Sequence, residues 1–218
     1  MSNFQMYPSG DSCLVVEFEK TIDPLVNGRC VSLAGRMRAA SRHGVRDVVP
    51  TYQTVAVYFD PLVTDTPALR EELSWLAATS VAQQTEEAVP IEVPVRYGGA
   101  FGPDLADVAH STGCSEDEVI ELHTRPTYHV YMLGFLPGFA YMGRVDPRLE
   151  VARLPTPRLR VPAGSVGIAG AQTGIYPVDA PGGWRLIGHT TARPFDPARK
   201  EPFLFAPGDR VTFVAVSS

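Results

Sequence analysis

The chain has 218 residues, 44% of them hydrophobic, and its 24 acidic and 19 basic residues give a formal net charge of -5. This length and apolar content are enough to bury a hydrophobic core, and they favour two modest domains over a disordered chain. Because charges of both signs are interspersed and no Lys/Arg-rich run occurs, the composition excludes nucleic acid as a partner.

The first ten residues have neither the positively charged start nor the apolar core of a signal peptide. No later stretch is apolar over the length that a bilayer requires. We therefore expect a cytoplasmic protein without a membrane partner.

The first part of the chain alternates predicted strands and helices. Residues 12–19 alternate apolar and polar side chains, which is typical of a strand with one buried face. A helix is predicted to begin at Asp23-Pro24 and to end near Gly44, with Val26, Cys30, Leu33 and Met37 along one apolar stripe.

A hairpin and a second helix follow. Residues 45–49 and 54–59 are rich in β-branched and aromatic side chains, and the short stretch between them suits a turn. The second helix is predicted to begin at Thr66-Pro67, with Thr66 as its cap. If residues 91–95 form the last strand, the order βαββαβ matches the ferredoxin-like split motif.

A polar stretch with weak periodicity, residues 82–89, is the best candidate for a linker. We therefore predict two domains, residues 1–84 and residues 85–218.

The second domain is predicted to begin with two short helices and to continue as a β-barrel or sandwich. The first helix covers residues 104–110, and the second opens at Ser115 with Glu118 three residues later, which is a capping box. From Tyr128 onward, Pro and Gly separate short apolar runs that read as strands, at residues 128–135, 164–169, 184–187 and 211–216.

Residues 162–177 contain four closely spaced glycines. Glycine permits positive φ and close backbone approach, so this Gly-rich segment either makes tight barrel turns or gathers N–H groups around an anion or carbonyl. It fits neither the Rossmann nor the P-loop spacing. Ala163-Gly164-Ser165-Val166-Gly167 superficially resembles a nucleophile elbow. It lacks the following helix that this motif needs, so Ser165 is interpreted as a hydrogen-bonding residue and not as a nucleophile.

The five histidines and three cysteines show no metal-ligand spacing, and no metal site is predicted. The cysteines are expected to be reduced and mostly buried. His189, just after the Gly-rich segment, is a candidate catalytic or ligand-contacting residue, and the alternative is a structural histidine.

Residues 135–143 form an aromatic run bent by Pro and Gly. Such a run lines a pocket, forms a partner surface or fills a buried corner of the barrel.

Several of these segments together resemble one protein family, which includes the B subunit of 5-oxoprolinase, allophanate hydrolase subunit 1 and the Kip-type sporulation-kinase inhibitor. The segments are residues 134–139 with Tyr141, Pro157-Arg158, residues 162–177, residues 181–184 and Ile187-Gly188. The resemblance implies an α+β protein in which a ferredoxin-like domain precedes a cyclophilin-like β-barrel. This chain has Gly188-His189-Thr190-Thr191 where the family often has Gly-Arg-Thr-Pro.

The resemblance implies a protein that works with two partners, homologues of the C-type subunit (the allophanate hydrolase subunit 2 type) and of the A-type subunit. Together they would convert the small molecule 5-oxo-L-proline to L-glutamate, using ATP with its Mg²⁺. ATP binding is then shared with the partner or uses an unfamiliar site, because no P-loop is present. Predicted catalytic residues are Gln172, His189 and Ser165. Predicted substrate-binding residues are Phe139, Gly167, Ile168, Thr173, Tyr176 and Trp184.

Two alternatives stay open at this point. A carboxyltransferase-type protein would place urea or a similar amide in the same pocket, but it would need a separate biotin carrier. A Kip-type inhibitor would dock on a histidine kinase and use the barrel to bind a peptide. Amidase-type allophanate hydrolysis needs a Ser-Ser-Lys set, and the two lysines, Lys20 and Lys200, lie far from any Gly/Ser-rich core.

Overall fold

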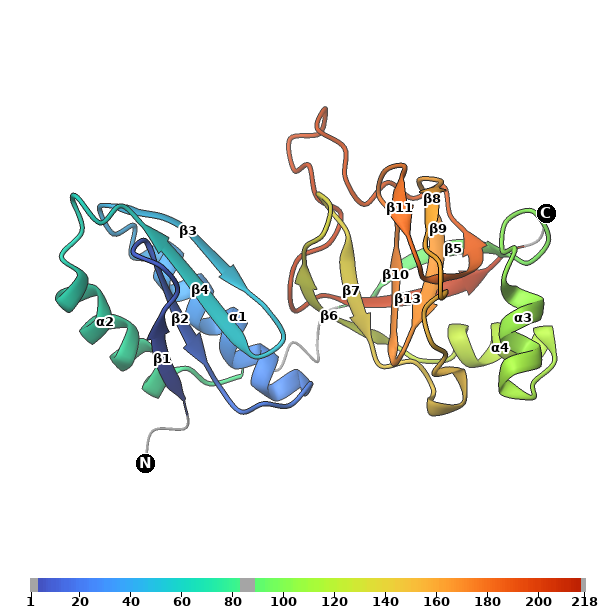
Figure 1. The fold of residues 1–218 in the computed structure, drawn as a ribbon, viewed down its shortest axis with the longest axis horizontal. Coiled ribbons are helices and arrows are strands. Elements are labelled where there is room, and N and C mark those ends of the chain that lie inside the picture. The colour runs from blue at the N-terminus through green and yellow to red at the C-terminus, as the bar shows by residue number, and fades with distance from the viewer. Residues whose placement is uncertain (1–3, 83–88, 217–218) are drawn as a thin grey trace. The chain divides into compact units, whose positions relative to one another are not determined.

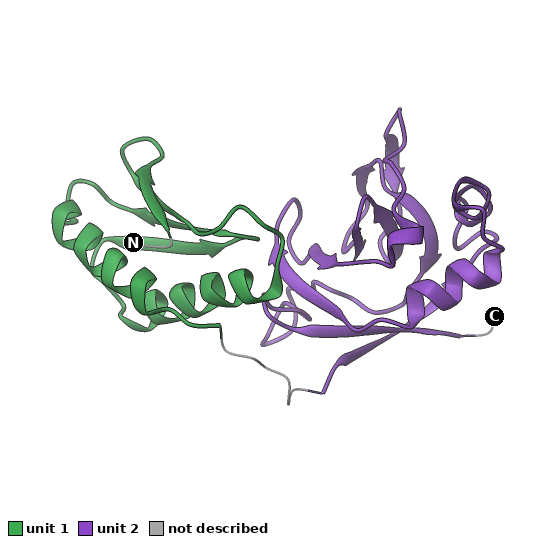
Figure 2. Ribbon diagram, turned by 90° about the horizontal axis from the view of Figure 1, so that it is seen from below, with its two compact units in different colours: residues 1–86 green, residues 87–218 purple. Residues whose placement is uncertain are grey.

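The computed structural model describes residues 4–82 and 89–216. The chain divides into two compact units, residues 1–86 and 87–218 (Figure 2). The predicted boundary between residues 84 and 85 lies outside the described residues. None of the described helices is both long and apolar enough to cross a membrane.

The first unit is a four-stranded antiparallel sheet with two helices (Figure 1). Its strands follow the order β1-β2-β4-β3. The elements are β1 (Gln5–Pro8), β2 (Cys13–Glu17), α1 (Pro24–Ala39), β3 (Val45–Pro50), β4 (Thr54–Phe59) and α2 (Thr66–Thr79).

The edge strand of this sheet comes from a different part of the chain than predicted. β1 pairs with β2, in the place that the last strand of the split motif would fill. Residues 91–95 instead belong to a strand of the second unit. The alternation of apolar and polar residues identifies a strand but not the strand with which it pairs. The sequence pattern therefore assigned the wrong segment to this edge of the sheet.

Both helices of the first unit begin at an aspartate and bury the predicted apolar face. Asp23 accepts hydrogen bonds from the backbone N–H groups of the first turn of α1, which ends at Ala39, earlier than predicted. Gly44 has φ +84° in the turn that leads into β3. The cap of α2 is Asp65 and not Thr66, because its carboxylate accepts from the N–H of Ala68 at 3.0 Å.

The second unit is built around a closed barrel whose strand order is β10-β7-β6-β13-β5-β12-β9. Closure gives each of these strands two neighbours and leaves no exposed edge. The strands are β5 (Ile91–Tyr97), β6 (Tyr128–Leu133), β7 (Ala140–Gly143), β9 (Ser165–Ala169), β10 (Gln172–Ile175), β12 (Arg185–His189) and β13 (Arg210–Ala215).

Two helices and a small sheet complete this unit. The helices are α3 (Leu105–Thr112) and α4 (Glu116–Thr124), and the predicted capping box of Ser115 and Glu118 is present in α4. β8 (Arg158–Val161) and β11 (Ala180–Gly182) form a separate two-stranded sheet. A short 3₁₀ helix covers Pro147–Leu149.

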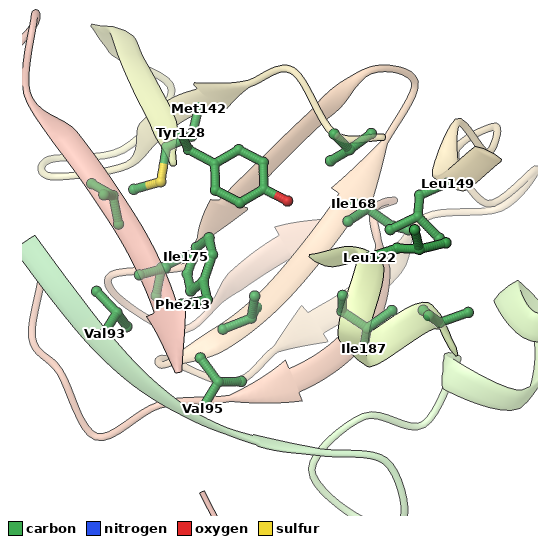
Figure 3. Packing of buried hydrophobic residues seen from close by; sticks show 14 of the residues in the cluster. Val93, Val95, Leu122, Tyr128, Met142, Leu149, Ile168, Ile175, Ile187 and Phe213 are labelled. Atoms are coloured by element: carbon green, nitrogen blue, oxygen red, sulfur yellow. The ribbon is translucent and has the colours of Figure 1, made fainter. Parts of the chain in front are cut away.

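Aliphatic and aromatic side chains from most of the barrel strands fill its interior (Figure 3). Val95, Ile168, Ile187 and Phe213 are all at most 2% exposed. Leu122 of α4 belongs to the same core. The barrel interior is therefore a packed core, in line with the predicted cyclophilin-like barrel.

Candidate functional site

The Gly-rich segment forms an antiparallel hairpin of β9 and β10, with a turn at Gly170 and Ala171. Of its four glycines, only Gly164 and Gly170 have positive φ, at +83° and +54°. β9 also pairs with β12, and β10 also pairs with β7, so strand ladders use both edges of the hairpin. The backbone N–H groups of these strands therefore do not converge on a ligand as an anion cradle.

The three predicted catalytic residues do not meet. Gln172 lies opposite Ala169 at one end of β9. Ser165 lies at the other end, opposite His189 of β12. Because a strand of five residues spans about 13 Å, Gln172 and the Ser165–His189 pair lie at separate ends of the hairpin.

His189 contacts the turn that precedes β9. One of its ring nitrogens, Nε2, lies 2.9 Å from the carbonyl oxygen of Ala163, which accepts a hydrogen bond. The half-buried ring covers Gly164, where a Cβ would lie 2.7 Å from Nε2. This contact fits the structural alternative for His189, in which its ring holds the turn before β9.

Two predicted substrate-binding residues, Ile168 and Thr173, point into the barrel and are fully buried. The Thr173 hydroxyl donates to the carbonyl of Gly167 at 3.1 Å and lies 2.8 Å from Nε2 of His123. Nδ1 of the same imidazole lies 2.8 Å from the hydroxyl of Tyr97. If Thr173 donates to Gly167, then Nε2–H of a neutral His123 donates to Thr173 and the Tyr97 hydroxyl donates to Nδ1.

Sequence reasoning missed His123. The available signal was its position on α4, next to Leu122 on the helix face that enters the core. Burial lowers the pKa of His123 from 6.5 to about 3. The imidazole is therefore a neutral, fully buried link between α4, β5 and β10.

This burial predicts that acid destabilises the chain. Unfolded His123 binds a proton below its ordinary pKa of 6.5, whereas folded His123 stays neutral down to about 3. Between these values the unfolded state binds more protons, so the free energy of unfolding falls by about 1.4 kcal/mol per pH unit as pH decreases.

Urea unfolding near pH 7 and pH 5 measures the effect. His123→Gln removes the titrating group, and its loss of stability between the two conditions should be about 2 kcal/mol smaller than that of the wild type. His110→Gln changes an exposed histidine on α3 and serves as the control. Equal slopes for wild type and His123→Gln would contradict the assignment.

Three of the predicted substrate-binding residues, Phe139, Tyr176 and Trp184, contact one another. With Tyr141 they form a group that we call the aromatic cluster. The ring centroids of Phe139 lie 5.2 Å from Tyr176, 5.3 Å from Trp184 and 4.9 Å from Tyr141, all in edge-to-face geometry. Three of the rings are at most 4% exposed, and Tyr141 is partly exposed.

The rings of this cluster pack directly on two glycines of the hairpin. A Cβ at Gly167 would lie 3.1 Å from Cβ of Trp184. A Cβ at Gly174 would lie 3.3 Å from the rings of both Phe139 and Trp184. Gly167, which has no positive φ, is therefore required for close packing of the rings on the strands and not for a turn.

An exposed phenylalanine in a rare backbone conformation borders the cluster. Phe135 has φ +69°, its side chain is 61% exposed, and its ring lies edge-on to Phe139 at 5.7 Å. Bulky residues rarely adopt this region, and such conformations gather at functional sites. The turn thus presents an aromatic ring to solvent next to the buried cluster.

Comparison with known proteins identifies the family. The sequence matches the family described as carboxyltransferase domain, subdomain C and D, over residues 4–205. The chain belongs to this carboxyltransferase-domain family. It is 42% identical to the B subunit of 5-oxoprolinase from Escherichia coli O157:H7, over 98% of this chain and 97% of that protein. It is 38% identical to the B subunit of 5-oxoprolinase from Bacillus subtilis (strain 168), over 98% and 93%.

A solved structure agrees with the fold. The crystal structure of TTHA0988 in space group P212121 has a TM-score of 0.86 and 39% identity, covering 94% of this chain. The match spans only 40% of that chain, so this sequence is about two fifths of its length.

In this member of the carboxyltransferase-domain family, a buried ion pair lies beside the aromatic cluster. Oδ1 of Asp104 lies 2.6 Å from Nη2 of Arg158, and Oδ2 accepts from the N–H of Leu186 at 2.6 Å. The Asp104 side chain is only 5% exposed. Pro157-Arg158 was part of the family resemblance, but the sequence alone did not show that Arg158 is a site residue.

Among the described residues, no group of three or more His, Cys, Asp or Glu side chains could hold a metal ion. The cysteines Cys13, Cys30 and Cys114 are free thiols, and the first two are buried.

Proposed function

We propose that this chain is the B-type component of a heteromeric 5-oxoprolinase that uses ATP to open the lactam of 5-oxo-L-proline to L-glutamate. The observation that carries the proposal is the similarity to two proteins named as the B subunit of 5-oxoprolinase, over nearly the full length of all three chains. These names favour the oxoprolinase over a urea-type or Kip-type role.

The chemistry explains the need for ATP. A lactam amide is a poor electrophile, and transfer of the γ-phosphoryl group to its oxygen, with loss of ADP, activates the ring carbon. Water then adds to that carbon and the ring C–N bond breaks, with a proton passing to nitrogen. A second water hydrolyses the resulting acyl phosphate to L-glutamate and phosphate. Hydrogen-bond donors that face the lactam oxygen stabilise the charge that develops there.

The Gly-rich hairpin does not suit ATP. Its backbone is committed to strand pairing, so it cannot cradle phosphates as a P-loop does. We therefore assign ATP and its Mg²⁺ to a site that a partner protein supplies at least in part.

The separation of the predicted catalytic residues supports a partner requirement. In this proposal either Gln172 or the Ser165–His189 pair contacts the small lactam, because the two lie at opposite ends of β9. Homologues of the C-type and A-type subunits supply the remaining catalytic groups.

The purified chain alone should be inactive, and a complex with both partners should form L-glutamate from 5-oxo-L-proline only when ATP is present. Coexpression, affinity purification through a tag on this chain and a glutamate assay test this together. Each partner is omitted in turn as a control. Turnover by the single chain at enzyme-like rates would overturn the partner requirement, and turnover of urea instead of the lactam would favour the alternative activity.

A further inference from the structure

We propose that Arg153 and Arg158 form a binding site for a carboxylate at the edge of the aromatic cluster. The site itself follows from the arrangement of side chains. Only the identification of its ligand with the carboxylate of 5-oxo-L-proline rests on the proposed function.

Strand pairing places Arg158 beside the cluster. Arg158 of β8 lies directly opposite Gly182 of β11. A Cβ at Gly182 would overlap the hydroxyl of Tyr176 and lie 2.8 Å from its ring carbons. Side chains of directly opposed residues leave an antiparallel pair on the same face. The Arg158 side chain therefore leaves its strand on the face where the Tyr176 hydroxyl lies.

The two terminal nitrogens of the Arg158 guanidinium differ in their hydrogen bonding. Nη2 pairs with Asp104, which fixes the guanidinium plane. Nη1 is buried and has no hydrogen-bond partner among the described residues. A buried N–H donor without an acceptor lowers the stability of the fold. A ligand oxygen that accepts a hydrogen bond from Nη1 would therefore be stabilised there.

The backbone next to Arg153 is tied to the segment that carries Trp184. The N–H of Leu154 donates to the carbonyl of Gly183 at 2.7 Å, so the residue that follows Arg153 contacts the residue that precedes Trp184. Burial raises the pKa of Tyr141 and of Tyr176, and the positive charge of Arg153 opposes the rise in both. The positive charge of Arg153 thus acts on two hydroxyls of the cluster.

The local charge suits a carboxylate better than a phosphate. Arg158 is neutralised by Asp104, and the nearby Arg160 and Arg185 form ion pairs with Asp179 and Asp107. Within the described part of the chain, no carboxylate forms an ion pair with the exposed Arg153. The site therefore offers one uncompensated positive charge and a fixed N–H donor, which matches a singly charged oxyanion.

Fluorescence of Trp184 in the full chain tests the site. The other tryptophan, Trp75, lies in the first unit, and Trp75→Phe leaves Trp184 as the only reporter. The probes are 5-oxo-L-proline, benzoate, the uncharged lactam 2-pyrrolidone and inorganic phosphate. We expect both carboxylates to bind and 2-pyrrolidone and phosphate to bind at least about tenfold more weakly.

Variants separate the two arginines. Arg153→Gln and Arg158→Lys should each weaken carboxylate binding about tenfold. Arg158→Lys keeps a positive charge for Asp104 but removes the Nη1 donor. Arg160→Gln, on the same strand but paired with Asp179, should bind as the wild type does. Carboxylate binding that is absent, unchanged in Arg153→Gln, or weaker than phosphate binding would overturn the proposal.

Assays of the reconstituted complex keep the two proposals distinct. Arg153→Gln should raise KM for 5-oxo-L-proline about tenfold while kcat stays within about twofold, as expected for loss of uniform binding. Unchanged KM in an active complex would overturn the carboxylate site and leave the proposed function intact. Arg153-dependent benzoate binding by a chain whose complex never opens the lactam would overturn the function and leave the site intact.

Discussion

Asp104→Ala is expected to lower the free energy of unfolding by about 3 kcal/mol, because removing one partner of a buried ion pair leaves the other unsatisfied. The substitution strips the guanidinium of Arg158 of its 2.6 Å contact. It also leaves the N–H of Leu186 without its acceptor. The side chain of Arg158 is 30% exposed. The expected loss of stability is therefore at the lower end of the range for a buried ion pair.

Two control variants isolate the cause. Asp107→Ala removes an exposed carboxylate from the same helix, whose oxygen lies 3.7 Å from Arg185, and should change stability by less than about 0.5 kcal/mol. Asp104→Asn keeps an acceptor for Leu186 but not the charge, and should fall between the two. Chemical denaturation of the purified chains measures all three. Equal stabilities for Asp104→Ala and Asp107→Ala would show that the buried pair is not stabilising.

Gly102→Ala is expected to cost at least about 3 kcal/mol, because its new methyl group would overlap backbone, which cannot move aside as a side chain can. A Cβ at this position would overlap the carbonyl group of Ile187 and lie 2.7 Å from the backbone nitrogen of Gly98. These atoms belong to the turn in which Gly98 donates to Ile187 and Gly102 donates to Gly98. The turn also leads into Asp104, so the buried ion pair should be disturbed with it.

Gly99→Ala provides the matched control in the same turn. Gly99 has φ +53° but nothing within 4 Å of its missing Cβ, so alanine should cost only about 1 kcal/mol of backbone strain. Thermal or urea unfolding compares the two variants. If Gly102→Ala costs no more than Gly99→Ala, the backbone relaxes to admit a methyl group and the close approach is not a constraint.

Most secondary structure of this chain could be predicted from periodicity and capping residues. The apolar stripe of Val26, Cys30, Leu33 and Met37 predicted the buried face of α1, and Ser115 with Glu118 predicted the start of α4. These signals are local, because a helix cap or an amphipathic face depends on residues within one or two turns. Errors arose at the ends of elements, where Asp65 caps α2 instead of Thr66.

The pairing of strands could not be predicted in the same way. Residues 91–95 have the pattern of a strand, and either the first sheet or the barrel could use it. The structure places them between β12 and β13, while β1 completes the first sheet. The backbone N–H and C=O groups are the same in almost every residue, so they do not distinguish one strand partner from another. The choice of partner therefore depends on long-range packing and chain connectivity.

The sequence by itself determined which residues were candidates for the site, and the tertiary structure decided which of them meet. The family resemblance identified Phe139, Tyr176 and Trp184 as candidate substrate-binding residues, and these three pack together. The strand period of two sends Ile168 and Thr173 into the barrel, away from the aromatic cluster, and a sequence pattern does not say which face is interior. His123 and Arg158 gain their roles from contacts with residues far away in the sequence, among them Thr173 and Asp104, that folding brings within hydrogen-bonding distance.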